Sequence, residues 1–157
     1  MDDAFCAAIR VRLSEVTQGA HGAVVGPIWI AGGESGGAFP EASWSDFPLV
    51  LLASWIPSLR RLVTQGQAAE CRFIDGPYHF TVGAAAPEEW RVACFEHREG
   101  PSAANAVAEW RTTPSVFLGS ALVAARGILG YCDKRQWWNP DTDRLRTVIA
   151  TADPSAV

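Results

Sequence analysis

The stretch AECRFIDGPYHFTVGA (residues 69–84) constrains the fold more than any other, because two alternating runs of apolar and polar residues flank a Gly-Pro pair. Alternation with a period of two is typical of half-buried strands, and glycine followed by proline suits a type II′ turn. Counting outward from that turn pairs Phe73 with Phe80 and Cys71 with Val82. The stretch therefore predicts an antiparallel hairpin with one apolar face.

Other segments of the chain repeat either this alternation or a helical period. Alternation predicts strands over residues 7–16, 23–31, 89–99 and 105–113. Apolar residues at i, i+3, i+4 and i+7 predict helices over residues 45–66 and 115–135 and a shorter one after Pro140 that Asp141 or Thr142 would cap. Because the strands are bunched, we expect an α+β fold: an antiparallel sheet of about five to six strands with two long helices on one face and a short C-terminal helix.

Composition and charge limit the classes of function. The chain has 157 residues, 48% of them hydrophobic and 19% charged, so we expect one domain over residues 1–157 with a frayed tail at 152–157. A net charge of −4 disfavours nucleic acid and anionic membranes and favours a basic partner. The N-terminus lacks the features of a secretory signal, and the longest apolar stretch, residues 47–57, is shorter than the roughly 20 residues of a membrane span. We therefore expect a cytoplasmic protein.

The cysteines and histidines show no metal-binding pattern. The four cysteines are widely separated: Cys6, Cys71, Cys94 and Cys132. With no C-x-x-C pair and no histidines at ligand spacing, we expect buried free thiols in a reducing compartment, no metal and no cofactor. His79 and His97 fall on the mixed face of the predicted sheet, near Glu96, Glu99 and Glu109. An acid–base or metal cluster at these two histidines is the alternative interpretation.

Residues 33–37 read Gly-Glu-Ser-Gly-Gly, which fits the G-x-S-x-G nucleophile elbow of α/β-hydrolases. The elbow needs a strand before the serine and a helix directly after it. The run before Ser35 suits a strand, but the residues that follow, GAFPEAS, disfavour a helix. Ser35, Asp75 and His97 occur in the chain order of a hydrolase triad, as residues of these types do in most chains of this length. We therefore interpret the segment as a loop with Glu34 at its tip, and keep a small serine hydrolase using Ser35 with a histidine as an alternative.

Two adjacent tryptophans suggest a binding surface. Trp137 and Trp138 cannot both face the core at a helix end, because neighbouring residues of a helix point in different directions. Asp141 and Asp143 follow them, and aromatic side chains beside acidic ones are typical of protein-binding patches. The alternative is that one indole caps the core while the other packs on the loop between the helices.

Two further patches combine aromatic and acidic residues. Asp75 and Tyr78 flank the tip of the predicted hairpin, and Trp44 precedes Asp46. The predicted partner-binding residues are Trp137, Trp138, Asp141, Asp143, Asp75, Tyr78 and Glu34. The acidic groups would steer the encounter with a partner, and the aromatic groups would supply buried contact.

The segments WSDFPLVLLASWIPSLRRL (44–62) and CRFIDGPYHFTV (71–82), with a tryptophan in the next strand and two helices at the C-terminus, resemble small bacterial immunity proteins of interbacterial toxin systems. The resemblance covers residues 44–150. It implies a small, acidic, cytosolic and non-catalytic protein that neutralises a cognate toxin domain by binding it. That class shares no site motif, so no functional residue is carried over. The further alternative is a ligand-binding or structural module without a toxin partner.

Overall fold

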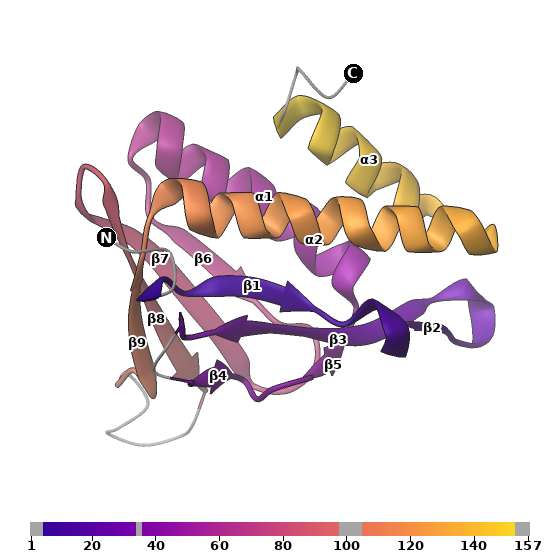
Figure 1. Cartoon of the computed structure of the whole chain (residues 1–157), viewed down its shortest axis with the longest axis horizontal. Helices are drawn as coiled ribbons and strands as arrows, with labels where there is room; N and C mark the ends of the chain where they lie inside the picture. The colour runs from indigo at the N-terminus through magenta and orange to yellow at the C-terminus, as the bar shows by residue number, and fades with distance from the viewer. Residues whose placement is uncertain (1–4, 34–35, 98–104, 153–157) are drawn as a thin grey trace.

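The computed structural model describes residues 5–33, 36–97 and 105–152 of the chain. The fold is α+β, as the sequence predicts, and the described strands form two antiparallel sheets rather than one (Figure 1). In chain order the elements are β1 (Ala8–Val11), η2 (Leu13–Glu15), β2 (Thr17–Gln18), η3 (Ala20–Gly22), β3 (Val24–Ala31), β4 (Ala38–Phe39), β5 (Ser45–Asp46), α1 (Pro48–Gln65), β6 (Ala69–Arg72), β7 (Tyr78–Ala86), β8 (Glu89–Glu96), β9 (Ala108–Thr112), α2 (Pro114–Arg135) and α3 (Pro140–Ala152).

The first sheet is organised around β3, which pairs with β1, β2, β4 and β5. Pro27 lies in β3 at the point where its partner changes: β1 pairs with residues 28–31 and β2 with residues 24–25. Proline is tolerated there because its missing N–H interrupts neither pairing. The predicted strand over residues 7–16 therefore ends at Val11, and the chain turns through η2 before it returns as β2.

The second sheet is the meander β6-β7-β8-β9. Cys71 pairs with Phe80, so the pairing is shifted by two residues from the predicted one, and the two-residue turn is wrong. The loop is longer because the buried carboxylate of Asp46 accepts a hydrogen bond from the backbone N–H of Asp75 at 3.0 Å. A shift of two residues leaves every side chain on its expected face, so the apolar face of the hairpin is preserved.

The two sheets meet where β1 begins and β9 ends. The N–H of Ala7 donates to the carbonyl of Arg111 at 2.9 Å, and the hydroxyl of Thr112 donates to the carbonyl of Ala7 at 2.8 Å. Further along β1, the N–H of Ile9 donates to the hydroxyl of Ser120 in α2 at 2.8 Å. The edge of β1 is thus covered by a helix and by the second sheet, which protects it from pairing with other chains.

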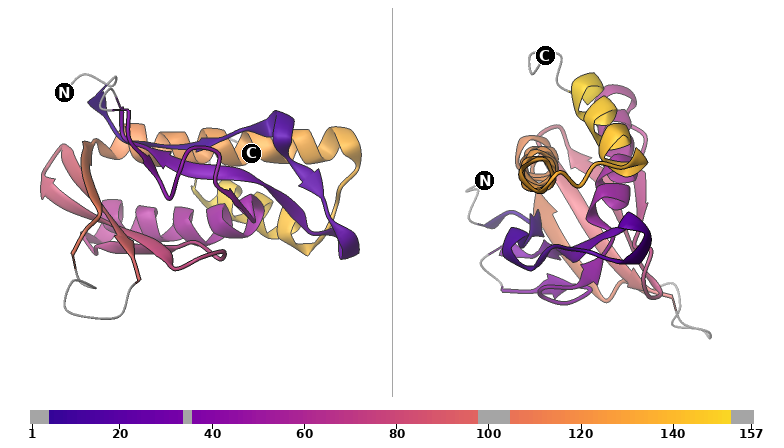
Figure 2. Two further views of the ribbon diagram at one scale, coloured as in Figure 1. Left: turned by 90° about the horizontal axis from the view of Figure 1, so that it is seen from below. Right: turned by 90° about the vertical axis from the view of Figure 1, so that its right-hand side faces the viewer.

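The helices bury the inner face of the second sheet and the flank of the first. The indole of Trp55 in α1 lies with its ring centroid 5.0 Å from those of Phe73 and Phe80, and its N–H donates to the carbonyl of Arg72 at 3.0 Å. α2 runs beside β1, and α3 folds back over α1 and α2 (Figures 1 and 2). The core therefore lies between α1, α2 and the inner faces of both sheets.

The helix boundaries follow local chemistry. α1 begins at Pro48 rather than at Ser45, because Ser45 and Asp46 pair with β3 as strand β5. It ends at Gln65, next to the predicted boundary, and its C-cap Gly66 has a φ of 68°, the left-handed conformation that glycine adopts without strain. α2 is long and apolar enough to cross a membrane by length and composition alone, a test that the core helix of a soluble protein also passes. Its buried residues belong to the core of this fold.

Candidate functional site

The glycine-rich segment that contains the G-x-S-x-G pattern packs against Trp110. A Cβ atom at Gly32 would lie 2.4 Å from the indole, and one at Gly37 would lie 2.7 Å from it. The N–H of Gly32 donates to the carbonyl of Gly37 at 2.8 Å. The residues that follow form the short strand β4 rather than the helix of a nucleophile elbow. Glu34 and Ser35 themselves lie outside the described residues.

The other residues considered for catalysis are Asp75, His79 and His97, which lie in or next to the four-stranded sheet. Asp75 is exposed in the β6–β7 loop, and the backbone N–H of His97 donates to the carbonyl of Pro77 at 2.6 Å. The ring of His79 stacks on Phe95 with centroids 4.9 Å apart, and burial lowers the pKa of this imidazole below its usual value. Within residues 5–33, 36–97 and 105–152, no group of three or more His, Cys, Asp or Glu side chains could hold a metal ion.

The cysteines are buried free thiols, as the sequence predicts. Burial raises the pKa of Cys94 to about 12 and that of Cys71 even further. A thiol with so high a pKa carries almost no thiolate at neutral pH, and thiolate is the nucleophile in cysteine catalysis. The arrangement around these two sulfurs therefore suits packing.

The patch predicted at the hairpin tip is largely a structural junction. Tyr78 packs edge-on against Trp44 and Phe39, with ring centroids 5.1 and 5.6 Å away. The Asp46 carboxylate accepts the indole N–H of Trp44 at 3.2 Å and the backbone N–H of Phe47 at 2.8 Å. Of the predicted binding residues here, Asp75 alone is well exposed. These contacts give the aromatic residues of both predicted patches, Trp44 and Tyr78, a role in packing.

The α2–α3 junction separates its two tryptophans. Trp137 packs against the core, and its ring centroid lies 6.0 Å from that of Tyr131. Trp138 is 62% exposed, and its indole N–H donates to Oδ1 of Asp133 at 3.1 Å. Both carboxylate oxygens of Asp133 also accept hydrogen bonds from the Arg146 guanidinium, which lowers the pKa of Asp133 below its usual value. The junction thus holds one large aromatic side chain in a defined position on the surface.

The two acidic residues predicted beside these tryptophans lie in the first turn of α3. Asn139 caps this helix: its Oδ1 accepts the N–H of Thr142 at 2.9 Å, and the Thr142 hydroxyl accepts the N–H of Asn139 at 3.0 Å. The prediction that Asp141 or Thr142 is the N-cap is wrong, because this reciprocal pairing begins one residue before Pro140. Asp141 and Asp143 favour the helix through its positive N-terminal end, and Asp143 is exposed.

A groove of about 460 Å³ lies between α2 and α3. The lining residues are Arg126, Leu129, Gly130, Asp133, Arg146, Ile149 and Ala150. Its floor is aliphatic, and Asp133, which holds the Trp138 indole, belongs to its wall. Val123, which is 69% exposed, lies seven residues before Gly130 on the same face of α2. Exposed apolar side chains thus flank an aliphatic groove, an arrangement typical of protein-binding surfaces.

The apolar pattern of the sequence does not reveal this groove, because Leu129 and Ile149 fit the apolar stripes of their helices. The signals available were the small residue Gly130 and the apolar Val123 off the predicted stripe. Of the predicted binding residues, Trp137, Trp138, Asp141 and Asp143 belong to the α2–α3 junction, while Asp75 and Tyr78 belong to the β6–β7 loop and the start of β7. The start of β7 lies apart from the α2–α3 junction in Figures 1 and 2.

Comparison of the chain with known protein families, with curated proteins and with solved structures found no match. Inference about function therefore depends on the residues and their geometry.

Proposed function

We propose that the chain is a non-catalytic, cytoplasmic immunity protein that binds and neutralises a toxin domain, with the α2–α3 groove and Trp138 at the centre of its binding surface. The observation that carries this proposal is the exposed Trp138 indole, held in place by Asp133. Tryptophan is among the residues that contribute most to protein interfaces, and a side chain that is already ordered loses less conformational entropy on binding.

Charge supports the approach of a basic partner. The chain carries a net charge of −4, which attracts a basic protein over a longer range than any single contact. At the groove itself the charges are mixed, since Arg126 and Arg146 accompany Asp133. Asp143, exposed in the first turn of α3, adds an acidic group five residues after Trp138. Acidic groups would thus speed the encounter, and aromatic and aliphatic contacts would hold the complex.

The proposal is tested with the whole chain and one matched pair of variants. Trp138→Ala removes the proposed anchor, and Ile74→Ala removes an exposed apolar side chain, 52% accessible, from the β6–β7 loop. Tagged wild type and both variants are incubated with lysate of the native host, and proteins lost only with Trp138→Ala are identified. Each captured protein is then produced in a test bacterium, first alone and then together with wild type or a variant of this chain.

We expect a protein that inhibits growth when produced alone, and growth restored by wild type and Ile74→Ala. The affinity of purified Trp138→Ala for that protein should fall by about thirtyfold, corresponding to about 2 kcal/mol for an interface hot spot. A retained protein that does not affect growth would rule out the immunity function. Equal affinity of wild type and Trp138→Ala would rule out the groove as the binding surface.

A further inference from the structure

The outer face of the four-stranded sheet carries an incomplete set of ion pairs. Arg91 on β8 and Arg111 on β9 are directly opposite each other in the sheet register. Like charges in this position repel each other, so the pair costs stability. Arg111 is partly neutralised by Glu89, with 3.1 Å between Nε and Oε1. Arg91 forms no ion pair with any residue of the part of the chain that the structure describes.

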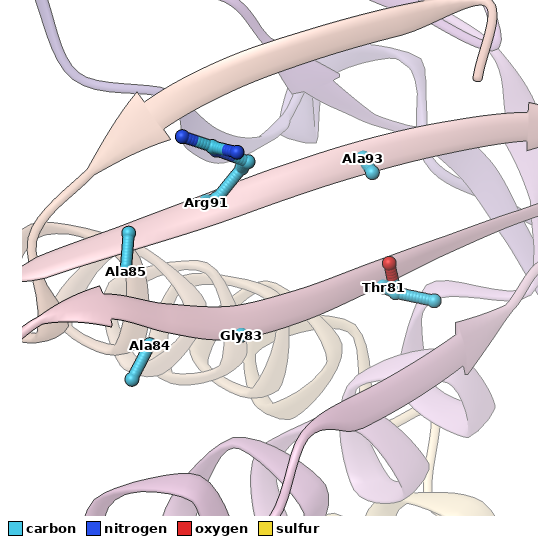
Figure 3. A pocket seen from close by; sticks show the side chains of 6 residues that line it. All are labelled: Thr81, Gly83, Ala84, Ala85, Arg91 and Ala93. Carbon is cyan, nitrogen blue, oxygen red and sulfur yellow. The ribbon is translucent and has the colours of Figure 1, made fainter.

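The surface around Arg91 is hollowed because its neighbours are small. A hollow of about 380 Å³ lies over β7 and β8 and is lined by Thr81, Gly83, Ala84, Ala85, Arg91 and Ala93. Figure 3 shows the Arg91 guanidinium leaning toward β9, away from the open floor at Gly83 and Ala93. A Cβ atom at Gly83 would meet nothing within 4 Å, so packing within the chain does not require glycine there. A second hollow of about 250 Å³, which includes Glu109 and Arg111, lies on the other side of Arg91.

We propose that this face binds a short acidic polypeptide segment of a partner protein, whose carboxylates pair with Arg91 and Arg111. The planar guanidinium group presents parallel N–H donors that match the two oxygens of a carboxylate. A bound carboxylate would also relieve the repulsion between the two arginines. The floor of small residues leaves room for a backbone to lie close to the sheet.

The charges around the arginines favour a peptide over a nucleic acid. Glu89 and Glu109 lie on the same face, and the chain as a whole carries a net charge of −4. A nucleic acid has a negative charge at every nucleotide and would place phosphates against these glutamates. A polypeptide can place acidic residues at the arginines and neutral residues at the glutamates.

This surface is separate from the α2–α3 groove. The helices cover the inner face of the four-stranded sheet, whereas the hollow is on its outer face (Figures 2 and 3). The proposed ligand also has the opposite charge from the basic partner proposed for the chain as a whole. The inference therefore goes beyond the proposed function, and its test does not depend on whether Trp138 binds a partner.

The test measures binding of a fluorescein-labelled oligoglutamate peptide to the full chain by fluorescence anisotropy at low ionic strength. We expect saturable binding that Arg91→Glu weakens about tenfold or more, since it replaces a charge-assisted contact by repulsion. The control is Arg61→Glu, which makes the same change in net charge at an exposed arginine of α1. An uncharged oligoglutamine peptide should not bind wild type.

A second variant tests the hollow without changing charge. Gly83→Leu fills the floor beside Arg91, and because no atom lies near that position the chain should still fold, as circular dichroism would verify. We expect it to weaken oligoglutamate binding severalfold. The proposal is overturned if Arg61→Glu weakens binding as much as Arg91→Glu, if wild type does not bind the peptide, or if oligothymidylate binds more tightly than oligoglutamate.

Discussion

The glycine-rich loop and the α2–α3 junction are each arranged around a tryptophan, and the two arrangements are opposite. In the loop, Gly32 and Gly37 approach the indole of Trp110 so closely that no side chain would fit between them. At the junction, Trp138 projects from the surface, and its indole N–H donates to Asp133. Trp110 is half-buried against the loop, whereas Trp138 is accessible to other molecules.

A sequence pattern typical of catalysis and a surface suited to binding thus lie in different places in this molecule. The G-x-S-x-G pattern suggests catalysis, yet its last glycine, Gly37, and Gly32 just before it are explained by their contact with Trp110. The α2–α3 junction matches no catalytic motif, yet it presents a large aromatic side chain that is 62% exposed. A residue that packing fully explains gives little evidence of function, whereas an ordered residue without a packing partner gives more.

The largest expected effect separates the two tryptophans by stability. Trp110→Ala should lower the free energy of unfolding by about 3 kcal/mol, because it removes a partly buried indole and leaves a cavity against the glycine-rich loop. Trp138→Ala should change it by less than about 0.5 kcal/mol, as expected for an exposed position. Urea denaturation followed by circular dichroism measures both. Similar losses in the two variants would remove the distinction between the two regions.

A smaller loss of stability should follow from a substitution at Gly32, where the backbone of the loop lies close to the Trp110 indole. Gly32→Ala should cost about 2 kcal/mol, since its Cβ would overlap the Trp110 indole. The cost should fall in a Trp110→Ala background, where the overlap is absent. Gly36→Ala is the control: a Cβ there meets nothing within 4 Å, although the φ of 74° still costs about 1 kcal/mol. Equal costs of Gly32→Ala with and without Trp110 would contradict the packing argument.

At the junction, the helix cap should matter less than the packing of Trp110. Asn139→Ala removes the side-chain acceptor for the N–H of Thr142 and should lower the free energy of unfolding by about 1 kcal/mol. Asn139→Asp keeps that acceptor but loses the hydrogen bond from the side-chain amide to the carbonyl of Gly22 at 3.1 Å, so it should recover only part of the stability. Thermal denaturation of the three proteins makes the comparison. Asn139→Asp as unstable as Asn139→Ala would show that Asn139 acts through another contact.

The smallest effect concerns the ion pair that orders Trp138. The hydrogen bond from Arg146 lowers the pKa of Asp133 in the folded chain, so its stabilisation is present above a pH of about 4 and is lost as the pH falls below the folded value. At neutral pH, Asp133→Asn should cost no more than about 0.5 kcal/mol, because the pair is exposed to solvent. Urea denaturation at neutral and acidic pH should show this difference vanishing in acid. A difference that stays constant would exclude ionisation as its cause.

Much of the architecture can be predicted from local patterns. The hairpin runs, the helical stripes and the stop at Gly66 follow from periodicity and backbone preference. The longer β6–β7 loop could not be predicted, because it depends on the carboxylate of Asp46, 29 residues away in sequence from Asp75. The division into two sheets likewise depends on contacts between Ala7 and Arg111, which no local pattern reveals.

The candidate site is predictable in part. The adjacency of Trp137 and Trp138 indicates that one of them is exposed, but which one depends on the turn at Gln136, where φ is 56°. The groove beside Trp138 forms only when α3 folds back on α2, so its lining residues cannot be assigned from either helix alone. Pairing between Asp133 and Arg146, 13 residues apart, is a product of the same fold-back.

The buried thiols also divide the molecule into regions whose opening can be followed separately. Cys71 and Cys94 belong to the second sheet, Cys132 to α2, and Cys6 to the segment that enters β1. An alkylating reagent reaches a buried sulfur only after the surrounding structure opens, so the modification rate at each cysteine reflects the free energy of that opening. Mass spectrometry of the four sites over time would distinguish fraying of one region from unfolding of the whole chain, without any engineered label.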